Sequence, residues 1–533
     1  MSAPPGAQSA DLTTLLAHEM AACLRAGEIT SRDLTAAHLE RARRTDRGLH
    51  AWLSLDDERA LTEADAADGR LAAARAEGSD AVTALHPLHG VPVALKDLVS
   101  LKGGQCTAGS RILEGYRAPY DAHIVELLHA AGAVVLGKTN MDEFAMGSSC
   151  EHSAFGPTAN PWDLERVPGG SSGGSAASVA AFHTPLAIGT DTGGSIRQPA
   201  ALCGIVGMKP TYGRVSRYGI VAFASSLDQI GPFARDVRDA SALLHAVSGR
   251  DERDSTSAPV PVPDDLLALP ASDDEAAWWL RGRRLGLPRE YFVAGMEPGV
   301  EARIREAVGA LEAAGATVEE VSLPHTDYGL ATYYIVAPAE ASANLARYDG
   351  VRFGHSVRGG SDYLADYLAT RGSGFGAEVK RRIMLGTYAL SAGYYDAFYL
   401  KALKVRTLIK RDFDTLFEAG FDALVAPTTS DVAFRFGAKM ADPVRMYLSD
   451  ACTLPVNMAG LPGISVPCGL AEGLPVGLQL IGPAWSEAML MRAARAYEGV
   501  TADADWRRVQ PHDLALLGDA SVPTPAERAA RAH

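Results

Sequence analysis

The sequence predicts an α/β protein whose β-sheet is covered by helices on both faces. From Gly90 onward, short apolar runs alternate with amphipathic helical segments. Apolar runs of this kind are typical of strands that are buried on both faces of a sheet. The composition agrees, because 47% hydrophobic and 21% charged residues are ordinary values for a globular protein. The length of 533 residues alone allows one to three domains.

The expected elements follow in chain order. Two helices are predicted between about Asp11 and Ala42, where apolar residues recur at helical spacing, break at Gly27 and resume at the capping serine of ITSRDL. Later helices are predicted in DAHIVELLHAAG and ARIREAVGALEAAG. Strands are predicted in VPVAL, AVVLGKT, PLAIGTDT, LVAPTT, GISVPC and PVGLQLIG.

Two polar stretches interrupt this pattern. Residues 248–276 are rich in Pro, Asp and Ser and can connect two lobes, and a polar, Ala- and Arg-rich stretch ends the chain. We therefore predict one large domain over residues 1–500, with an insertion at about 248–276, followed by a polar tail over 501–533.

Charge and cysteine usage exclude several classes of protein. The net charge of −14 argues against a broad basic surface that would bind nucleic acid without a partner. No apolar run is long enough to span a membrane, and the first residues lack the pattern of a secretory signal, so a cytoplasmic location is expected. The cysteines lack CxxC pairing, so neither a disulfide framework nor a zinc site is expected. They are Cys23, Cys106, Cys150, Cys203, Cys452 and Cys468.

Two glycine-rich stretches contain the candidate nucleophiles. VPGGSSGGSAASVAA places Ser171 and Ser172 between glycine pairs, and Ser195 follows Gly193 and Gly194. The first stretch fits the G-x-S-x-G nucleophile elbow, but the polar, Pro-containing TANPWDLER before it cannot be the central strand that an elbow requires. A phosphate loop is also disfavoured, because neither GGSSGGS nor GIVGMKPT ends in Gly-Lys-Ser/Thr.

A third interpretation joins both stretches to Lys96 in GVPVALKDL. Ser195 would be the nucleophile, and Lys96, at the end of an apolar strand, would be the base that activates it. Burial would have to lower the pKa of the amine from about 10.4 to roughly 7 or 8, which costs about 4 kcal/mol. Asp97 would point to the opposite face of the strand, and Ser171 could relay the proton.

This combination resembles the amidase signature family, in which a lysine, a serine in GGSSGG and a serine in GGS form a Ser-cisSer-Lys triad. The resemblance implies a large mixed β-sheet with helices on both faces. It implies that Ser195 is the nucleophile, Ser171 the bridging serine and Lys96 the base. The residues implied to line the oxyanion hole are Thr192, Gly193 and Gly194.

Longer motifs resemble the branch of this family that serves tRNA-dependent amidotransferases. They include GKTNMDEFAMGSS, the stretch around GTDTGGSIRQPAALCGIVGMKPTYGRVSRYG, and MYLSDACTLPVNMAGLPGISVPCG. The resemblance implies hydrolysis of glutamine and transfer of the ammonia to Glu-tRNA(Gln), or in some members to Asp-tRNA(Asn). It implies the B and C subunits of the amidotransferase as partners in a heterotrimer, misacylated tRNA bound mainly by the B subunit, and ATP and Mg²⁺ at a partner. No metal or cofactor is expected on this chain.

The same resemblance suggests which residues bind glutamine. Arg382 would pair with the α-carboxylate, Asp450 with the α-ammonium group, and Tyr333 would line the pocket; Arg381 and Tyr334 are the alternative assignments. Two other functions remain open at this point: a stand-alone amidase of the same family, and a non-catalytic scaffold for a tRNA-binding partner.

Overall fold

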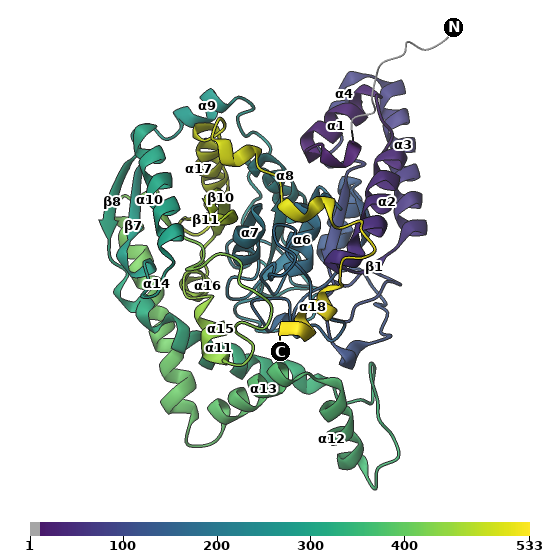
Figure 1. The fold of residues 1–533 in the computed structure, drawn as a ribbon, viewed down its shortest axis with the longest axis vertical. Coiled ribbons are helices and arrows are strands. Elements are labelled where there is room, and N and C mark those ends of the chain that lie inside the picture. Colours follow the sequence, from purple (N-terminus) through teal and green to yellow (C-terminus); the bar gives the residue numbers. More distant parts are fainter. Residues whose placement is uncertain (1–10, 533) are drawn as a thin grey trace.

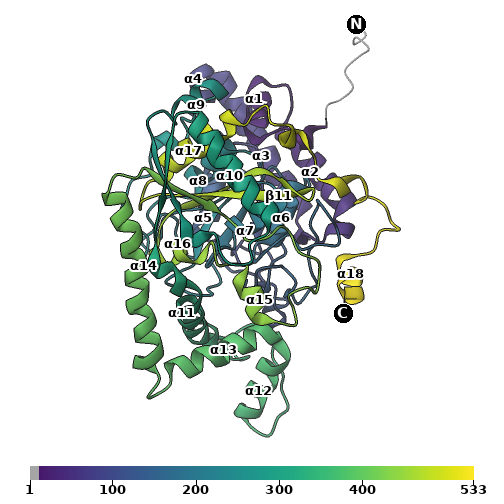
Figure 2. The same cartoon turned by 60° about the vertical axis from the view of Figure 1, so that its left-hand side comes forward.

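The computed structural model describes residues 11–532 (Figure 1). Its eleven strands form one sheet in the order β1-β3-β2-β4-β6-β5-β10-β11-β9-β7-β8. Parallel pairs, such as β2 with β4, occur beside antiparallel pairs, such as β10 with β11. Helices lie on both sides of this sheet in the rotated view (Figure 2). The predicted fold class, a mixed α/β sheet covered by helices, is therefore confirmed.

All six predicted strands form. They are β2 (Pro92–Lys96), β3 (Val134–Thr139), β4 (Leu186–Asp191), β9 (Ala423–Pro427), β10 (Gly463–Ala471) and β11 (Leu474–Ile481). The sheet contains five further strands that the sequence pattern did not indicate: β1 (Trp52–Leu55), β5 (Val206–Lys209), β6 (Gln229–Ala234), β7 (Arg284–Pro288) and β8 (Thr317–Val321).

The helices of the first half of the chain begin with the two that were predicted. They are α1 (Ala17–Ala26), α2 (Ser31–Leu49), α3 (Asp57–Glu77), α4 (Ser79–Ala84), α5 (His123–Ala131), α6 (Gly173–Ala180), α7 (Arg197–Cys203) and α8 (Val237–Val247). One detail of the prediction is wrong: Thr30, not Ser31, caps α2, because the Thr30 side chain accepts the N–H of Asp33. The Ser31 hydroxyl instead donates to Gly90 O at 2.8 Å.

The second half contains the remaining α-helices. They are α9 (Asp273–Trp278), α10 (Pro298–Ala313), α11 (Gly329–Asn344), α12 (Tyr363–Gly374), α13 (Ala377–Leu390), α14 (Lys401–Glu418), α15 (Pro443–Leu448), α16 (Leu454–Ala459), α17 (Glu487–Val500) and α18 (Pro525–Ala532). Short 3-10 or π turns connect several of them: η1 (Leu12–Thr14), η2 (Arg111–Leu113), η3 (Glu143–Ala145), η4 (Asp264–Leu266), η5 (Arg289–Tyr291), η6 (Pro324–Tyr328), η7 (Leu345–Arg347), η8 (Tyr395–Leu400), η9 (Asp505–Arg508) and η10 (His512–Ala515).

The sheet brings two strand ends together beside the start of α6. Strands β2 and β4 are parallel neighbours, and the carboxyl ends of parallel strands meet at one edge of a sheet. Lys96 is the last residue of β2, and Asp191 is the last residue of β4. The chain between these strands includes β3 and α6, which begins directly after Ser171 and Ser172. Lys96 and Ser171, which are 75 positions apart in the sequence, can therefore share one site.

The two polar stretches pack on the body of the protein. In residues 248–276, the only regular elements are η4 and the start of α9, yet Asp251, Asp254 and Leu266 are buried. In the C-terminal stretch, Arg528 is buried and donates to Gly48 O and Leu164 O, both at 3.1 Å. The proposed division at residue 500 stays a prediction.

Two further expectations concern membranes and thiols. Over residues 11–532, no helix has both the length and the apolar character needed to cross a bilayer. The first ten residues, on which part of the localisation argument depends, lie outside the described part of the chain. All six cysteines are free thiols, and five of them are buried.

Candidate active site

Lys96 ends β2 inside the protein, with its side chain fully buried. Its Nζ lies within hydrogen-bonding distance of three hydroxyl oxygens: Ser171 Oγ at 2.7 Å, Ser172 Oγ at 2.8 Å and Thr190 Oγ1 at 2.9 Å. Within the described residues, no carboxylate oxygen lies within 4.0 Å of this amine. The amine therefore has hydrogen-bonding partners but no counter-charge.

Burial without a counter-charge changes the protonation of Lys96. Removal from water disfavours the charged form and lowers the pKa of the amine from 10.5 to about 7, although more distant acids such as Asp142 oppose the change. The neighbouring Asp97 does not interfere, since its carboxylate accepts the N–H of Thr107 and lies 3.5 Å from Lys138 Nζ. Lys96 thus has the protonation behaviour that a general base near neutral pH requires.

Ser171 and Ser172 lie immediately before α6, and the peptide bond between Gly170 and Ser171 is cis. The Gly170 N–H donates to Gln198 Oε1 of α7 at 3.0 Å, so the glycine-rich loop is fixed to the helix that follows Ser195. No strand precedes this loop between β3 and α6. The nucleophile-elbow interpretation therefore lacks its strand, as expected from TANPWDLER.

The loop that carries Ser195 is held by a buried carboxylate. Asp191 Oδ1 accepts the Gly194 N–H at 2.8 Å, and Oδ2 accepts the Ile196 N–H at 3.2 Å. Burial alone would raise the pKa of Asp191, but the charge of Arg197, its hydrogen bonds to the carboxylate and the charge of Lys209 together outweigh burial and hold the pKa at about 2. The carboxylate therefore stays ionised and bonds the N–H groups on both sides of Ser195.

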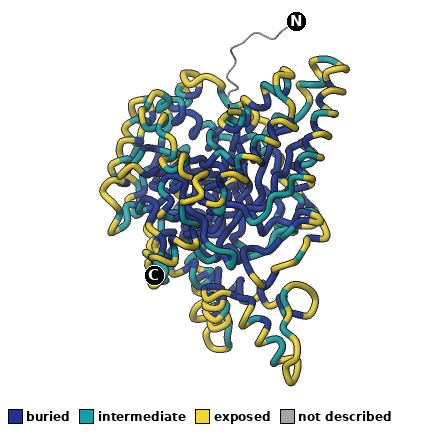
Figure 3. Tube along the Cα trace, turned by 45° about the vertical axis from the view of Figure 1, so that its right-hand side comes forward, coloured by how far each residue is buried: buried dark blue, intermediate teal, exposed yellow. Residues whose placement is uncertain are grey.

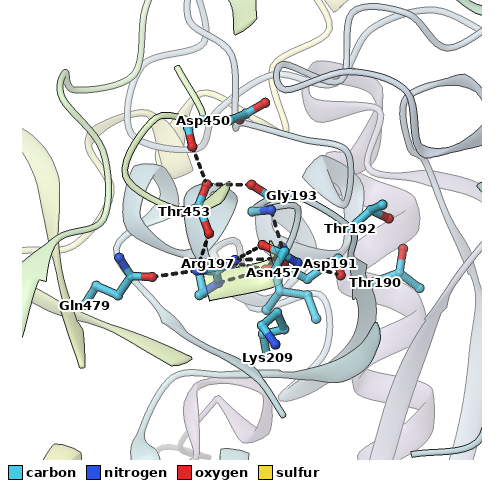
Figure 4. Close-up of polar contacts among 12 residues, drawn as sticks. Thr190, Asp191, Thr192, Gly193, Arg197, Lys209, Asp450, Thr453, Asn457 and Gln479 are labelled. Atoms are coloured by element: carbon cyan, nitrogen blue, oxygen red, sulfur yellow. Dashed lines mark hydrogen bonds and ion pairs between the residues drawn. The ribbon is translucent and has the colours of Figure 1, made fainter. Parts of the chain in front are cut away.

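Arg197, in turn, has all five of its guanidinium N–H groups bonded (Figure 4). Two go to Asp191, at 3.0 Å each. The others reach Thr453 O at 3.1 Å, Gln479 Oε1 at 2.6 Å and Asn457 Oδ1 at 2.6 Å. This network ties the Ser195 loop to β11 and α16, and a buried ion pair is stable only with such complete bonding.

The backbone around Ser195 is only partly hydrogen-bonded within the protein. Among the described residues, the N–H groups of Thr192, Gly193 and Ser195 have no protein acceptor, and Ser195 remains 7% exposed. The Gly194 N–H differs from expectation, because it is already bonded to Asp191. Gly194 can thus line an oxyanion hole but cannot donate its N–H to it in this arrangement.

Side chains around this loop restrict its geometry. The Thr192 hydroxyl donates to Asp228 Oδ1 at 2.7 Å, and Thr453 Oγ1 donates to Gly193 O at 2.6 Å. Tyr333 is buried against Gly193, since a Cβ placed on that glycine would lie 2.8 Å from the Tyr333 ring. The chain can pass here only without a side chain at Gly193.

Asp450 is linked to this backbone by Thr453 Oγ1, which bonds both Gly193 O and Asp450 O, and Arg382 lies next to Tyr334, the neighbour of Tyr333. Arg382 is buried on α13, and its guanidinium lies over the rings of Tyr334 at 5.2 Å and Tyr447 at 5.4 Å. Its Nε donates to Glu378 Oε1 at 2.7 Å. Asp450 accepts a hydrogen bond from Ser148 Oγ at 2.6 Å, and burial raises its pKa to about 7.

The structure distinguishes between the alternative assignments. The Arg381 side chain is 43% exposed, while that of Arg382 is only 3% exposed. Tyr333 contacts Gly193, whereas Tyr334 stacks on Tyr447 at 3.8 Å and supports the guanidinium. Arg382 and Tyr333 are therefore the better placed members of the two candidate pairs.

Sequence reasoning missed several residues of the site. Ser172 and Thr190 both bond Lys96, and Asn457 and Gln479 complete the environment of Arg197. Ser172 could have been found, since it shares the GGSSGG motif with Ser171. Thr190 could not, because its proximity to Lys96 depends on the register between β2 and β4.

Comparison with known proteins places the chain in a family. The family model described as Amidase matches residues 33–491, which is most of the chain. The chain belongs to the amidase family. The resemblance inferred from its serine and glycine motifs is thus confirmed, as is the prediction that the protein is an amidase-type enzyme.

Individual amidase-family relatives are similar over nearly their whole length. The A subunit of the Glutamyl-tRNA(Gln) amidotransferase of Moorella thermoacetica is 59% identical over 491 residues, covering 92% of this chain and 97% of the relative. The crystal structure of a protein of the same name from Thermotoga maritima is 42% identical, with a TM-score of 0.73, and covers 92% and 96% of the two chains. A peptide amidase from Stenotrophomonas maltophilia is 36% identical, with a TM-score of 0.77, and covers 94% and 98%.

Proposed function

We propose that this chain is the glutamine-hydrolysing component of a tRNA-dependent amidotransferase. The observation that carries the proposal is the buried Lys96 amine, which bonds three hydroxyls and, within the described residues, no carboxylate; one of these hydroxyls belongs to Thr190 near the end of β4, the strand that leads into the Ser195 loop. Relatives with 59% and 57% identity that are named as the A subunit of the Glutamyl-tRNA(Gln) amidotransferase support the choice of substrate.

The proposed reaction begins with proton transfer. Neutral Lys96 takes the Ser171 proton while Ser171 takes the proton of Ser195, whose Oγ attacks the carbon of the glutamine side-chain amide. The amide oxygen gains the negative charge of the tetrahedral intermediate. Free backbone N–H groups at Thr192, Gly193 and Ser195 are suited to stabilise that charge.

The intermediate then collapses with the proton moving back along the same path. Lys96 returns its proton through Ser171 to the amide nitrogen, the C–N bond breaks, and ammonia leaves. Water attacks the glutamyl ester on Ser195 by the same route, and glutamate is released. This half of the reaction needs no metal or organic cofactor on this chain.

Glutamine recognition would use three residues, Arg382, Asp450 and Tyr333. The Arg382 guanidinium suits the two oxygens of the α-carboxylate, and the Asp450 carboxylate suits the α-ammonium group. Both groups are buried, which strengthens each ionic contact by excluding water. Tyr333, packed on Gly193, would set the width of the pocket where the side-chain amide enters.

The released ammonia would be used by partner proteins rather than by this chain. We propose a heterotrimer with the B and C subunits of the amidotransferase, in which a partner binds ATP and Mg²⁺, activates the glutamyl group of Glu-tRNA(Gln), and binds the tRNA. The acidic character of this chain supports placing tRNA binding on a partner. Asp-tRNA(Asn) is the second acceptor to test in the same assay.

The test separates this function from a scaffold role. The complex is reconstituted with the B and C subunits, and amidation of Glu-tRNA(Gln) is measured with glutamine or with ammonium chloride as nitrogen source. Ser195→Ala is expected to abolish the glutamine-dependent reaction and to keep the ammonia-dependent one. Full glutamine-dependent activity in this variant would exclude Ser195 as the nucleophile, and Ser178→Ala, at a buried serine of α6 that does not bond Lys96, is the matched control.

A stand-alone amidase is the second candidate function. It is favoured by one observation, the higher TM-score of the peptide amidase (0.77) than of the Thermotoga maritima amidotransferase protein (0.73). Sequence identity favours the amidotransferase instead, since the chain is 36% identical to the peptide amidase and 42% identical to the Thermotoga maritima protein. A lone chain that hydrolyses small amides at full rate, and that gains nothing from the B and C subunits, would establish this alternative.

A further inference from the structure

Exposed apolar side chains gather in one segment of the protein. Eleven of the eighteen large apolar side chains that are exposed in the described residues belong to residues 351–398. This segment contains α12 and α13 and protrudes at the lower end of the molecule, where exposed residues dominate (Figure 3). Clusters of this kind, unlike scattered apolar residues, mark interaction sites on soluble proteins.

The central part of this cluster is continuous. On α13, Met384, Leu385 and Tyr388 are 72%, 44% and 52% exposed. The Tyr388 ring lies 4.5 Å from that of Tyr394 and 6.1 Å from that of Phe398, so the patch extends from α13 to η8. We call these five residues the α13–η8 face.

The opposite side of α13 belongs to the active site. Gly386 packs on α11 so closely that a Cβ would collide with Pro338 O, and Arg382 is buried beside the proposed glutamine pocket. Met384 is two residues from Arg382 along the same helix. A partner bound to the α13–η8 face would therefore contact the outer side of the helix that supplies the substrate guanidinium.

The charges around the α13–η8 face are mainly basic. Among the exposed residues 377–404, which cover α13, η8 and the start of α14, one is acidic, Asp396, and four are basic: Lys380, Arg381, Lys401 and Lys404. The face thus suits an apolar surface surrounded by carboxylates. The chain as a whole carries a net charge of −14, so the acidic remainder of a second copy would also be attracted to this face. Self-association is therefore a necessary control.

The side chains favour a protein over other binding partners. Tyr and Met are enriched in the centres of protein interfaces. Single-stranded nucleic acid would use the aromatic rings and basic groups but would leave Met384 and Leu385 without partners. A lipid surface usually meets an amphipathic helix with Trp, Phe or Leu on the apolar side, whereas three of these five residues are Tyr or Met.

We propose that the α13–η8 face is the docking surface for another protein of the amidotransferase complex, which presents an apolar patch surrounded by acidic residues. The proposal rests on the proposed function for the existence of that partner. Docking at this place would couple assembly to glutamine hydrolysis, because it fixes the outer side of the helix that carries Arg382.

The experiment compares the full chain with a surface variant, Met384→Asp combined with Tyr388→Asp. Both side chains are more than half exposed, so the variant is expected to fold and to hydrolyse glutamine as a lone chain within about twofold of the unchanged protein. Its affinity for the B and C subunits is expected to fall at least about tenfold. Trp278→Asp is the matched control, because Trp278 is 65% exposed on α9, outside the face, and should leave assembly unchanged.

Each outcome decides a separate point. If the unchanged chain does not bind the B and C subunits, the proposed function fails before the surface is tested. If it binds and the double variant binds equally well, the docking surface is wrong and the proposed function stands. Loss of a homodimer, of tRNA binding by the lone chain, or of binding to vesicles containing phosphatidylglycerol in the double variant, with assembly intact, would assign the face to that other partner and overturn the proposal.

Discussion

The protonation of Lys96 gives the proposed reaction a specific pH dependence. With a pKa of about 7, roughly a tenth of the protein carries the neutral amine at pH 6 and roughly nine tenths at pH 8. Only the neutral form can accept a proton from Ser171. At saturating glutamine, kcat should therefore rise about tenfold per pH unit below 7 and level off above it.

The size of the pKa shift of Lys96 follows from the burial of its amine. Lowering the pKa from 10.5 to about 7 means that the protein disfavours the ammonium by about 5 kcal/mol, at ~1.36 kcal/mol per pH unit. The three hydroxyls can accept hydrogen bonds from the ammonium, but they supply no charge. A carboxylate in their place would lift the pKa again and would shift the rise in kcat to higher pH.

The assay must separate Lys96 from other groups that titrate near neutrality. Asp450 also has a pKa of about 7, but it should be ionised once it binds the α-ammonium group of glutamine. The protonation of Asp450 should thus affect kcat/KM and not kcat. In the free enzyme both Lys96 and Asp450 must lose a proton, so log kcat/KM falls below about pH 6 with a slope near two. Ammonia release is measured from about pH 5.5 to 9 in the unchanged protein and in Lys209→Met, because Lys209 is a second buried lysine with a pKa of about 7.

Three results would refute the reasoning. A kcat that is constant between about pH 5.5 and 7.5 would mean that no group with this pKa must lose a proton. A kcat that still rises tenfold per pH unit at about pH 9, with no plateau, would mean that the amine is solvated or paired with an acid. A midpoint that disappears in Lys209→Met would show that the titration belongs to Lys209 and not to Lys96.

Three further predictions concern the pocket and the Ser195 loop. Arg382→Lys should raise the KM for glutamine roughly tenfold to a hundredfold, with kcat changed much less, because lysine cannot bond two carboxylate oxygens side by side; the exposed Arg381→Lys should change neither constant. Arg197→Met should lower the free energy of unfolding by about 3 to 5 kcal/mol in denaturant titrations, since it leaves a buried carboxylate unpaired, and a loss under about 1 kcal/mol would contradict this. Gly194→Ala should slow glutamine hydrolysis by roughly a hundredfold or more, because the residue has a φ of +140° and no room for a Cβ; Gly249→Ala, at φ +144° in open space, is the control and should keep full activity.

Local sequence pattern was sufficient to predict six of the buried strands, but it missed β5 and β6, which are also buried throughout. Strands β2, β4 and β11 are buried throughout and appear as largely apolar runs. Strand β8, with the sequence TVEEV, has no buried residue and carries two adjacent glutamates. It joins the sheet at one edge through parallel pairing with β7, and that pairing depends on contacts that no local pattern encodes.

The same limit applies to the active site. Lys96 and Ser171 could be linked because both belong to a recognisable combination of motifs. Thr453 and Gln479 could not, because they lie far from Ser195 in the sequence and reach its loop only through the packing of α16 and β11. Sequence spacing also could not show that the Gly194 N–H is bonded to Asp191.

A neutral lysine in this protein depends on the partners of the nearby acids. Asp97 is bonded to Thr107 and lies beside Lys138, and Asp191 is paired with Arg197, so neither carboxylate is free to bond Lys96. Asp142 accepts the N–H groups of Cys150 and His152. Asp228 likewise accepts the Thr192 hydroxyl and the N–H groups of Phe223 and Ala224.

These bonds explain why residues that never touch the substrate matter to the chemistry. Each bond keeps a carboxylate at a distance from the Lys96 amine. At that distance, the attraction between the carboxylate and the ammonium form of Lys96 is weaker than the free-energy cost of burying the ammonium charge. Releasing one of these acids, for instance by removing Arg197, would allow it to move toward the amine and raise the pKa of Lys96. Loss of the base through protonation would then accompany the loss of stability, and a shift of the kcat midpoint to higher pH in Arg197→Met would distinguish this effect from simple unfolding.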